Sequence, residues 1–319
     1  MSNTKKNIWI LGGTGFIGKS LVSQLSNNSD NILHLLIHKN MHYQDLELFN
    51  TFTGSLESFD LRWLEKYPPD IIYHLARLGG GNFLTRTLAA QKGAKANLRL
   101  ISFLSNLKSP PIVVYVSGSL MYGNQTQERM ADELTGLSPV SYARTYIQAE
   151  EPWIEAQQKC QLDIRFARPG WIIGSESWFK FFYWKPFLKT GKIPMYGDGR
   201  QLMSLIHVED CAGLIIHLGE FGITNQNLNI FCGQPITQVK FSETLANLLD
   251  AEIEPIPIQN LSRIYGKTIS EAFSTSIPLQ TKYTELVKGY KFRYPDLKSM
   301  FIQNLFVLKN QKSVFTKTP

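Results

Sequence analysis

Three glycines near the N-terminus have the spacing of a phosphate-binding turn. They follow the apolar run Asn7–Leu11 directly, within the stretch Gly12-Gly13-Thr14-Gly15-Phe16-Ile17-Gly18. The first glycine of such a turn permits a tight bend, the second lets backbone amides approach a pyrophosphate, and the third lets the next helix lie close to the strand. Because the N-terminus of that helix would present its positive end to phosphates, we predict that residues 12–18 bind a dinucleotide. A plain glycine-rich turn is the alternative.

The end of the second predicted strand indicates which dinucleotide binds. Proteins that bind NAD usually carry an acidic residue there, which holds the ribose hydroxyls. The corresponding residues of this chain, Leu36-Ile37-His38-Lys39-Asn40, include no acidic residue. A carboxylate would repel the additional phosphate of NADP, whereas Lys39 and His38 would attract it, so the sequence favours NADP(H) over NAD. The alternative is that Lys39 is a solvated loop residue.

Strands and helices must alternate to position this turn. Short apolar runs rich in β-branched residues predict strands, and the stretches between them have the length of helices. The predicted strands are Asn7–Leu11, Ile32–His38, Ile71–Leu75, Ile112–Ser117 and Leu162–Arg168, and the predicted helices are Gly15–Leu25, Thr85–Asn106 and Pro139–Cys160. Because parallel strands need crossover connections, the pattern predicts an α/β fold with a Rossmann-type doubly wound parallel sheet.

The second half of the chain does not continue this alternation. Residues 171–196 and 233–305 carry most of the remaining aromatic side chains. We therefore expect a dinucleotide-binding domain over residues 1–170 and mainly a smaller C-terminal substrate-binding unit over residues 171–308. Within the latter, residues 201–232 are expected to return to the Rossmann domain. Residues 309–319 are expected to form a flexible tail.

Further motifs make the chain resemble the short-chain dehydrogenase/reductase superfamily, in its extended, epimerase/dehydratase-like branch. The resemblance covers nearly the whole chain. After the glycine turn, its motifs are Asp70-Ile71-Ile72-Tyr73-His74-Leu75-Ala76, Val116-Ser117-Gly118-Ser119-Leu120-Met121-Tyr122-Gly123, Asp132-Glu133, Pro139, Tyr142, Arg168-Pro169-Gly170, Gly197-Asp198-Gly199, His207-Val208-Glu209-Asp210 and Tyr290–Leu297. The resemblance implies that Leu75, Ala76, Arg77, Tyr142 and Pro169 lie against the dinucleotide. It also implies a homodimer formed by the helices that bear residues 85–106 and Tyr142.

The catalytic positions depart from the family pattern. Members carry a Tyr-x-x-x-Lys pair on one helix, and the lysine holds the nicotinamide ribose and lowers the pKa of the tyrosine. Tyr142 matches the tyrosine, but Tyr146 stands at the position of the lysine. The family's catalytic serine or threonine corresponds to Gly118, which Ser117 and Ser119 flank. The resemblance thus makes Tyr142 the main catalytic candidate, with Ser117, Ser119 and Tyr146 beside it.

The absence of this lysine affects which type of reaction Tyr142 can catalyse. A phenol with a pKa of about 10 is protonated at neutral pH, and no neighbouring ammonium favours its phenolate here. Tyr142 is then a proton donor rather than a base, which suits hydride addition to a carbonyl or redox-neutral acid catalysis. An inert structural tyrosine is the alternative.

We therefore expect an NADP(H)-dependent oxidoreductase, a reductase or redox-neutral relative that acts on a small hydrophobic carbonyl compound in secondary metabolism. Two alternatives stay open. One is a non-catalytic NADP(H)-binding sensor or assembly factor, and the other is a nucleotide-sugar epimerase or dehydratase with bound NAD.

Two features favour a hydrophobic substrate. Members that act on nucleotide sugars commonly carry an arginine after the Gly-Asp-Gly turn, where this chain carries Met203. The aromatic run over residues 178–187 lies, in the family, over the cofactor and shapes the substrate pocket. Core packing or a subunit contact is the alternative for this run.

Composition excludes several other classes. The chain has 319 residues and a net charge of +7, with basic and acidic residues interspersed, so we do not expect nucleic-acid binding. Its three cysteines form no C-x-x-C pair, and its histidines lack metal-ligand spacing, so we expect no disulfide framework and no metal. No apolar run approaches the about 18 residues of a membrane span, and the start lacks a signal-peptide pattern, so we expect a cytoplasmic protein.

Overall fold

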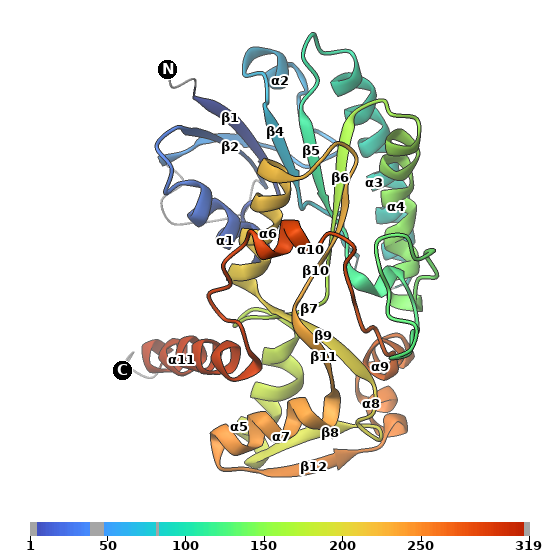
Figure 1. Ribbon diagram of the computed structural model, residues 1–319, viewed down its shortest axis with the longest axis vertical. Helices are drawn as coiled ribbons and strands as arrows, with labels where there is room; N and C mark the ends of the chain where they lie inside the picture. Colours follow the sequence, from blue (N-terminus) through green and yellow to red (C-terminus); the bar gives the residue numbers. More distant parts are fainter. Residues whose placement is uncertain (1–4, 39–47, 81–82, 316–319) are drawn as a thin grey trace.

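A seven-stranded parallel sheet forms one half of the molecule. Figure 1 shows the computed structural model, which describes residues 5–38, 48–80 and 83–315. The strand order is β10-β6-β5-β4-β1-β2-β3, and every neighbouring pair is parallel. The strands are β1 (Lys6–Leu11), β2 (Asn31–Ile37), β3 (Asn50–Thr53), β4 (Ile71–His74), β5 (Ile112–Val116), β6 (Asp163–Pro169) and β10 (Asn227–Ile230). The predicted Rossmann-type α/β fold is confirmed.

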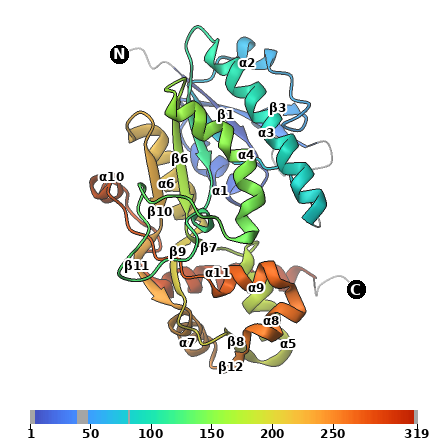
Figure 2. The same cartoon turned by 90° about the vertical axis from the view of Figure 1, so that its right-hand side faces the viewer.

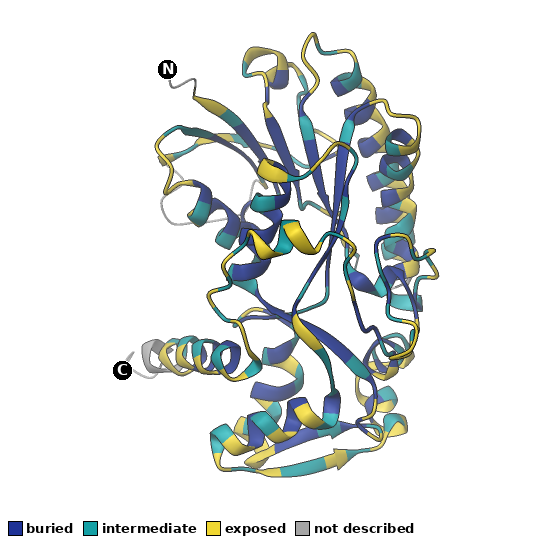
Figure 3. Ribbon diagram, in the orientation of Figure 1, coloured by how far each residue is buried: buried dark blue, intermediate teal, exposed yellow. Residues whose placement is uncertain are grey.

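Helices cover both faces of this sheet, which explains why its central strands are mostly apolar on both faces. Along β1, Ile8 and Ile10 belong to the core on one face, whereas Trp9 and Leu11 belong to the core on the other. The first face is covered by α1 (Phe16–Leu25) and α6 (Val208–Phe221), and the second by α2 (Arg62–Lys66), α3 (Phe83–Ser105) and α4 (Ser141–Gln158). Figure 2 shows α3 and α4 side by side, and Figure 3 shows the strands buried between the two layers.

The smaller unit has two short sheets of its own. One has the order β11-β9-β7, and the other pairs β12 with β8. Its strands are β7 (Trp171–Ile173), β8 (Lys192–Tyr196), β9 (Leu202–His207), β11 (Cys232–Thr237) and β12 (Glu252–Ile256). Its helices are α5 (Lys185–Thr190), α7 (Gln238–Leu249), α8 (Ile258–Tyr265), α9 (Lys267–Ser274) and α11 (Leu297–Phe315), while α10 (Thr284–Lys288) contacts α6 of the larger unit.

Two segments differ from the expected domain boundaries. Of residues 201–232, β10 joins the large sheet and α6 packs on its face, whereas β9 pairs with β7 and β11 in the small one. Helix α11 continues to Phe315, past the expected start of a flexible tail at residue 309. Leu305 and Leu308 are buried within this helix, and they anchor its last described turns against the core.

Among the residues that the structure describes, no helix is long and apolar enough to cross a membrane. Over the same residues, no three histidine, cysteine or acidic side chains gather closely enough to hold a metal ion.

Candidate functional site

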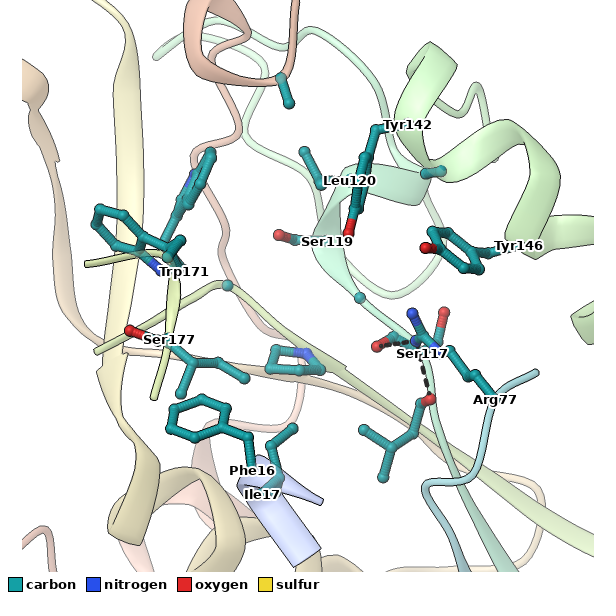
Figure 4. Close-up of a pocket in the computed structure, with 18 of the residues that line it drawn as sticks. Phe16, Ile17, Arg77, Ser117, Ser119, Leu120, Tyr142, Tyr146, Trp171 and Ser177 are labelled. Carbon is teal, nitrogen blue, oxygen red and sulfur yellow. Dashed lines mark hydrogen bonds between the residues drawn. The ribbon is translucent and has the colours of Figure 1, made fainter. Parts of the chain in front are cut away.

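A cavity of about 520 Å³ lies at the carboxyl ends of β1, β4, β5 and β6, between the two units. This edge of a doubly wound sheet is where ligands usually bind. The larger unit contributes the glycine turn, the ends of β4 and β5, and one face of α4. The smaller unit contributes the segment after β6 and helix α9. Figure 4 shows side chains from all these elements around one space.

The glycine turn is built from positions that exclude side chains. Gly12 has a φ of +94°, and a Cβ there would lie 2.8 Å from the backbone nitrogen of Ala76. A Cβ on Gly18 would lie 2.8 Å from Gly13 Cα and would collide with the Gly12 carbonyl oxygen. Gly15 precedes the first residue of α1, and its own N–H donates to the Gly12 carbonyl at 3.1 Å. The start of α1 therefore opens into the cavity with bare backbone, which fits a pyrophosphate.

Most of the predicted site residues line this cavity. They are Gly12, Gly15, Phe16, Ile17, Gly18, Leu75, Arg77, Ser117, Ser119, Tyr142, Tyr146 and Pro169. Gly13 instead faces the core, because a Cβ there would meet the side chains of Val22, Ile10 and Leu35. Thr14 and Ala76 belong to the same turns without lining the cavity, and His38 is exposed beyond the end of β2. Lys39 lies outside the described residues.

Tyr142 and Tyr146 stand one turn apart on the cavity face of α4. Their ring centroids are 5.5 Å apart and their planes meet at 60°. In Figure 4 the phenol oxygen of Tyr142 points into the cavity, towards the side that Phe16 and Ile17 close. Burial raises the pKa of Tyr142 to about 12, the Tyr146 phenol adds to the rise, and the guanidinium groups of Arg77 and Arg86 oppose it. At neutral pH the phenol of Tyr142 is therefore protonated.

The two candidate serines have different surroundings. The Ser117 hydroxyl donates to Glu150 Oε2 at 2.5 Å and accepts from Arg168 Nη1 at 2.9 Å. Arg168 Nη2 also pairs with Glu150 Oε1 at 2.7 Å, and both charged side chains are buried. The hydroxyl proton of Ser117 is thus used in a hydrogen bond to a buried ion pair. The hydroxyl of Ser119, by contrast, makes no hydrogen bond within the described residues and lines the cavity.

Arg77 brings a positive charge to the cavity from the loop after β4. Its Nη2 donates to the carbonyl oxygens of Val116 at 3.2 Å and Ser117 at 2.8 Å. Its guanidinium carbon lies 5.2 Å from the centroid of the Tyr146 ring. Figure 4 shows the guanidinium between Ser117 and Tyr146.

The aromatic run over residues 178–187 divides between two roles. Trp178 and Phe182 line the cavity, whereas Phe179 and Tyr183 are fully buried in the core and Phe181 is exposed. The run thus contributes both to the cavity wall and to the core. Gly174 lets the Phe16 ring approach, because a Cβ there would lie 2.6 Å from that ring.

Several cavity residues were not singled out from the sequence. Ile269, Ala272 and Phe273 of α9 form part of the wall. Their spacing of three and four residues places them on one helix face, which was the available signal. Glu150 had a similar signal, since it follows Tyr142 and Tyr146 at intervals of four residues on α4.

The predicted counterpart of the arginine of nucleotide-sugar enzymes is the apolar Met203. Met203 is buried in the core and does not line the cavity. Arg200 is exposed beside Asp198, at 3.8 Å, with 88% of its side chain accessible, and it does not line the cavity either. Among the described lining residues, Arg77 is the one basic side chain.

The histidines and acids of the matched motifs hold the structure together. His74 Nε2 lies 3.0 Å from Asn97 Oδ1 in the core, and His207 caps α6 by accepting from the Glu209 N–H. Glu133 accepts from the Thr281 hydroxyl at 2.6 Å and from the Lys282 N–H at 2.9 Å, which ties the loop before α4 to a distant segment.

Comparison with known proteins places this geometry in a family. Residues 8–230 match the model of the NAD dependent epimerase/dehydratase family. The epimerase family protein YfhF of Bacillus subtilis is 24% identical over 315 residues, which cover 91% of this chain and 95% of that protein.

Two solved structures share the fold at 18% identity. The dTDP-glucose 4,6-dehydratase of Bacillus anthracis, in complex with NAD, has a TM-score of 0.76 and covers 96% of this chain and 98% of its own. A human epimerase family protein with NADPH has a TM-score of 0.74 and covers 95% and 99%. The resemblance drawn from the motifs is confirmed, and the chain belongs to the NAD-dependent epimerase/dehydratase family.

Proposed function

We propose that this protein is an NADP(H)-dependent reductase, or a redox-neutral relative, that acts on a small hydrophobic carbonyl compound. The observation that carries the proposal is the position of Tyr142. Its protonated phenol opens into the same cavity as the bare glycine turn, and the walls of that cavity are mostly apolar.

The residues present fit a dinucleotide. Gly12, Gly15 and Gly18 border the cavity without side chains, the backbone is too close at Gly12 and Gly18 to admit a Cβ, and the turn leads into the N-terminus of α1. The end of β4 at Leu75 and the end of β6 at Pro169 border the same space. When bound, a reduced nicotinamide supplies the hydride that a carbonyl carbon accepts. The chain's own part is to hold the dinucleotide, to exclude water and to provide a proton.

Tyr142 provides that proton. Its phenol donates to the carbonyl oxygen as negative charge develops there, and the product is an alcohol. The Ser119 hydroxyl is free of protein partners within the described residues, so it is available to orient the carbonyl oxygen.

The walls support an apolar substrate over a nucleotide sugar. Trp171, Trp178, Phe182 and Phe273 face the cavity from the smaller unit. A diphosphate needs cations, and the position at which nucleotide-sugar enzymes carry an arginine is the buried Met203. A mostly apolar cavity with a few polar groups suits a hydrophobic ligand.

NADP(H) is proposed over NAD because residues 36–40 contain no acid. The human protein of this fold was solved with NADPH and the Bacillus anthracis dehydratase with NAD, so the fold itself accommodates either. Lys39→Asp should lower the affinity for NADPH and raise it for NADH. If the preference for NADPH over NADH does not change, Lys39 is a solvated loop residue that does not contact the dinucleotide.

Single-turnover mixing tests the proposed reaction. NADPH-loaded protein is mixed with a panel of hydrophobic aldehydes and ketones, and the nicotinamide absorbance is followed. Loss of that absorbance with formation of the alcohol supports a reductase, and substrate isomerisation without loss supports the redox-neutral relative. Dinucleotide binding with neither reaction, together with a protein partner recovered by pull-down, would instead support the non-catalytic sensor. Stabilisation by a nucleotide sugar with co-purifying NAD would support the epimerase or dehydratase.

We also propose that the chain forms a homodimer through α3 and α4. Helix α3 leaves Leu84, Leu88 and Leu98 exposed, at 72%, 58% and 54%. Sedimentation velocity should show twice the mass of one chain, and Leu88→Lys should shift the mass towards one chain.

A further inference from the structure

Helix α4 lacks a cation where it would face Tyr142. The fourth residue after Tyr142 on this helix is Tyr146, an aromatic residue. A cation comes from another element, because Arg77 follows β4 and reaches across to the ends of β5 and α4.

The position of Arg77 is fixed by three contacts. Nη2 donates to two successive carbonyl oxygens at the end of β5, those of Val116 and Ser117, at 3.2 and 2.8 Å. The guanidinium carbon lies 5.2 Å from the centroid of the Tyr146 ring, within the range of a cation–π contact. Tyr146 in turn packs edge-on against Tyr142.

We propose that Arg77 is a positioning residue that holds a permanent positive charge against the Tyr142–Tyr146 pair, in the place left by the missing lysine. A guanidinium stays charged at every pH at which the protein folds, so the charge does not depend on its surroundings. The proposal rests on the proposed function in one respect, namely that Tyr142 is the proton donor.

The effects of two other sets of charged groups near the tyrosine pair must be distinguished from the effect of Arg77. Arg86 of α3 also favours the phenolate of Tyr142. Glu150, further along α4, is paired with Arg168 of β6, and these two charges largely offset each other. Variants of Arg77 must therefore leave these groups in place.

The charge of Arg77 can be measured without turnover. A ring-fluorinated tyrosine is placed at position 142, and fluorine NMR follows its ionisation in the dinucleotide-free protein. Fluorination lowers the pKa of a phenol, which brings the titration into a range where the fold survives. Arg77→Gln keeps an amide donor for the two carbonyls but removes the charge, and we expect it to raise the pKa by about half a unit or more. Arg77→Lys keeps the charge and should restore most of the original value.

Arg99 provides the matched control. Its Nη2 also donates to two backbone carbonyls, those of Leu56 at 3.2 Å and Phe59 at 2.9 Å, and it does not line the cavity. Arg99→Gln should leave the titration unchanged. If Arg77→Gln shifts the pKa no more than Arg99→Gln does, or if Arg77→Lys fails to restore it, the proposal is overturned.

If Arg77→Gln does not fold, a measurement on the protein that retains Arg77 tests the proposal instead. Added salt screens the guanidinium, so the pKa of the fluorinated tyrosine should rise with ionic strength. A pKa that is independent of salt would contradict the proposal. If the protein reduces carbonyl compounds but Arg77→Gln does not raise the pKa of the tyrosine, only the proposed role of Arg77 is excluded. If Arg77→Gln raises that pKa but no turnover is found, only the proposed function is excluded.

Discussion

The phenol rings of Tyr142 and Tyr146 meet edge-on, 5.5 Å apart, on the face of α4 that borders the cavity. We propose that the pair stands in place of the tyrosine and lysine of the family pattern. Because the phenol of Tyr142 is protonated at pH 7, it can donate a proton but is a poor base. The direction of the proposed chemistry follows from this substitution.

Removing the Tyr142 hydroxyl should remove the proton donor. We expect Tyr142→Phe to lower kcat/KM for carbonyl reduction by about 100-fold or more, while the dinucleotide still binds. Tyr265→Phe is the control, since Tyr265 lies outside the cavity lining but contacts its wall at Phe182. Full turnover by Tyr142→Phe would exclude the phenol as the acid.

The pH profile should reflect the same group. Burial raises the pKa of Tyr142 to about 12, so the phenol keeps its proton across the neutral and mildly alkaline range. We therefore expect kcat/KM to show no alkaline fall from this group between about pH 7 and about pH 10. An alkaline limb near neutrality that Tyr142→Phe abolishes would contradict the assigned protonation state.

The two serines should respond differently to removal of their hydroxyls. Ser117→Ala takes a donor from the buried Glu150 carboxylate, so the free energy of unfolding should fall by about 1–3 kcal/mol. Ser119→Ala removes no hydrogen bond of the described protein and should leave stability nearly unchanged, while turnover falls roughly tenfold. Denaturant unfolding and steady-state kinetics measure both. The reverse pattern would assign the catalytic hydroxyl to Ser117.

This difference between the serines illustrates what the sequence could predict. The five predicted strands and three predicted helices lie within two residues of their observed ends, because apolar runs and glycines mark them locally. The motif also located Tyr142 and the glycine turn. It could not rank Ser117 against Ser119, because the partners of Ser117 are Glu150 and Arg168, which lie 33 and 51 residues away.

The elements missed from the sequence have weak local patterns. Strand β3 is a partly exposed edge strand without an apolar run, and its burial does not alternate. The cavity wall formed by Ile269 and Phe273 depends on how the smaller unit packs, which no local pattern records. The family resemblance indicated Arg77 as a site residue, but its contacts with β5 and α4 have no local signal in the sequence.

Alanine substitutions should separate the two functions of the glycine turn. In Gly18→Ala the new Cβ collides with backbone, so we expect a loss of about 1–3 kcal/mol in the free energy of unfolding. In Gly15→Ala the new Cβ meets only the Gly12 carbonyl oxygen, at 3.2 Å, and should chiefly lower dinucleotide affinity, by about tenfold or more. Gly136→Ala is the control, since its Cβ would have no atom within 4 Å. Equal affinities in all three variants would show that the turn does not hold the dinucleotide.

Buried histidines should make the fold sensitive to acid. Burial lowers the pKa of His34, His74 and His207 from 6.5 to about 4. Between these values the unfolded chain binds protons that the folded chain does not, so stability falls as the pH falls from 6.5 to about 4. Thermal melts across this range measure the loss, and NMR of the imidazole protons identifies the groups. A melting temperature that is flat over the range, or imidazoles that titrate near their ordinary pKa, would contradict the prediction.

Calorimetric titration of the purified protein with NADPH and NADH tests the central claim most directly, because everything proposed for Tyr142 depends on a dinucleotide in the glycine turn. We expect saturable binding of one nucleotide per chain, tighter for NADPH, and weakened by Gly15→Ala but not by Gly136→Ala. The absence of both heat and a melting shift with either nucleotide would contradict the account.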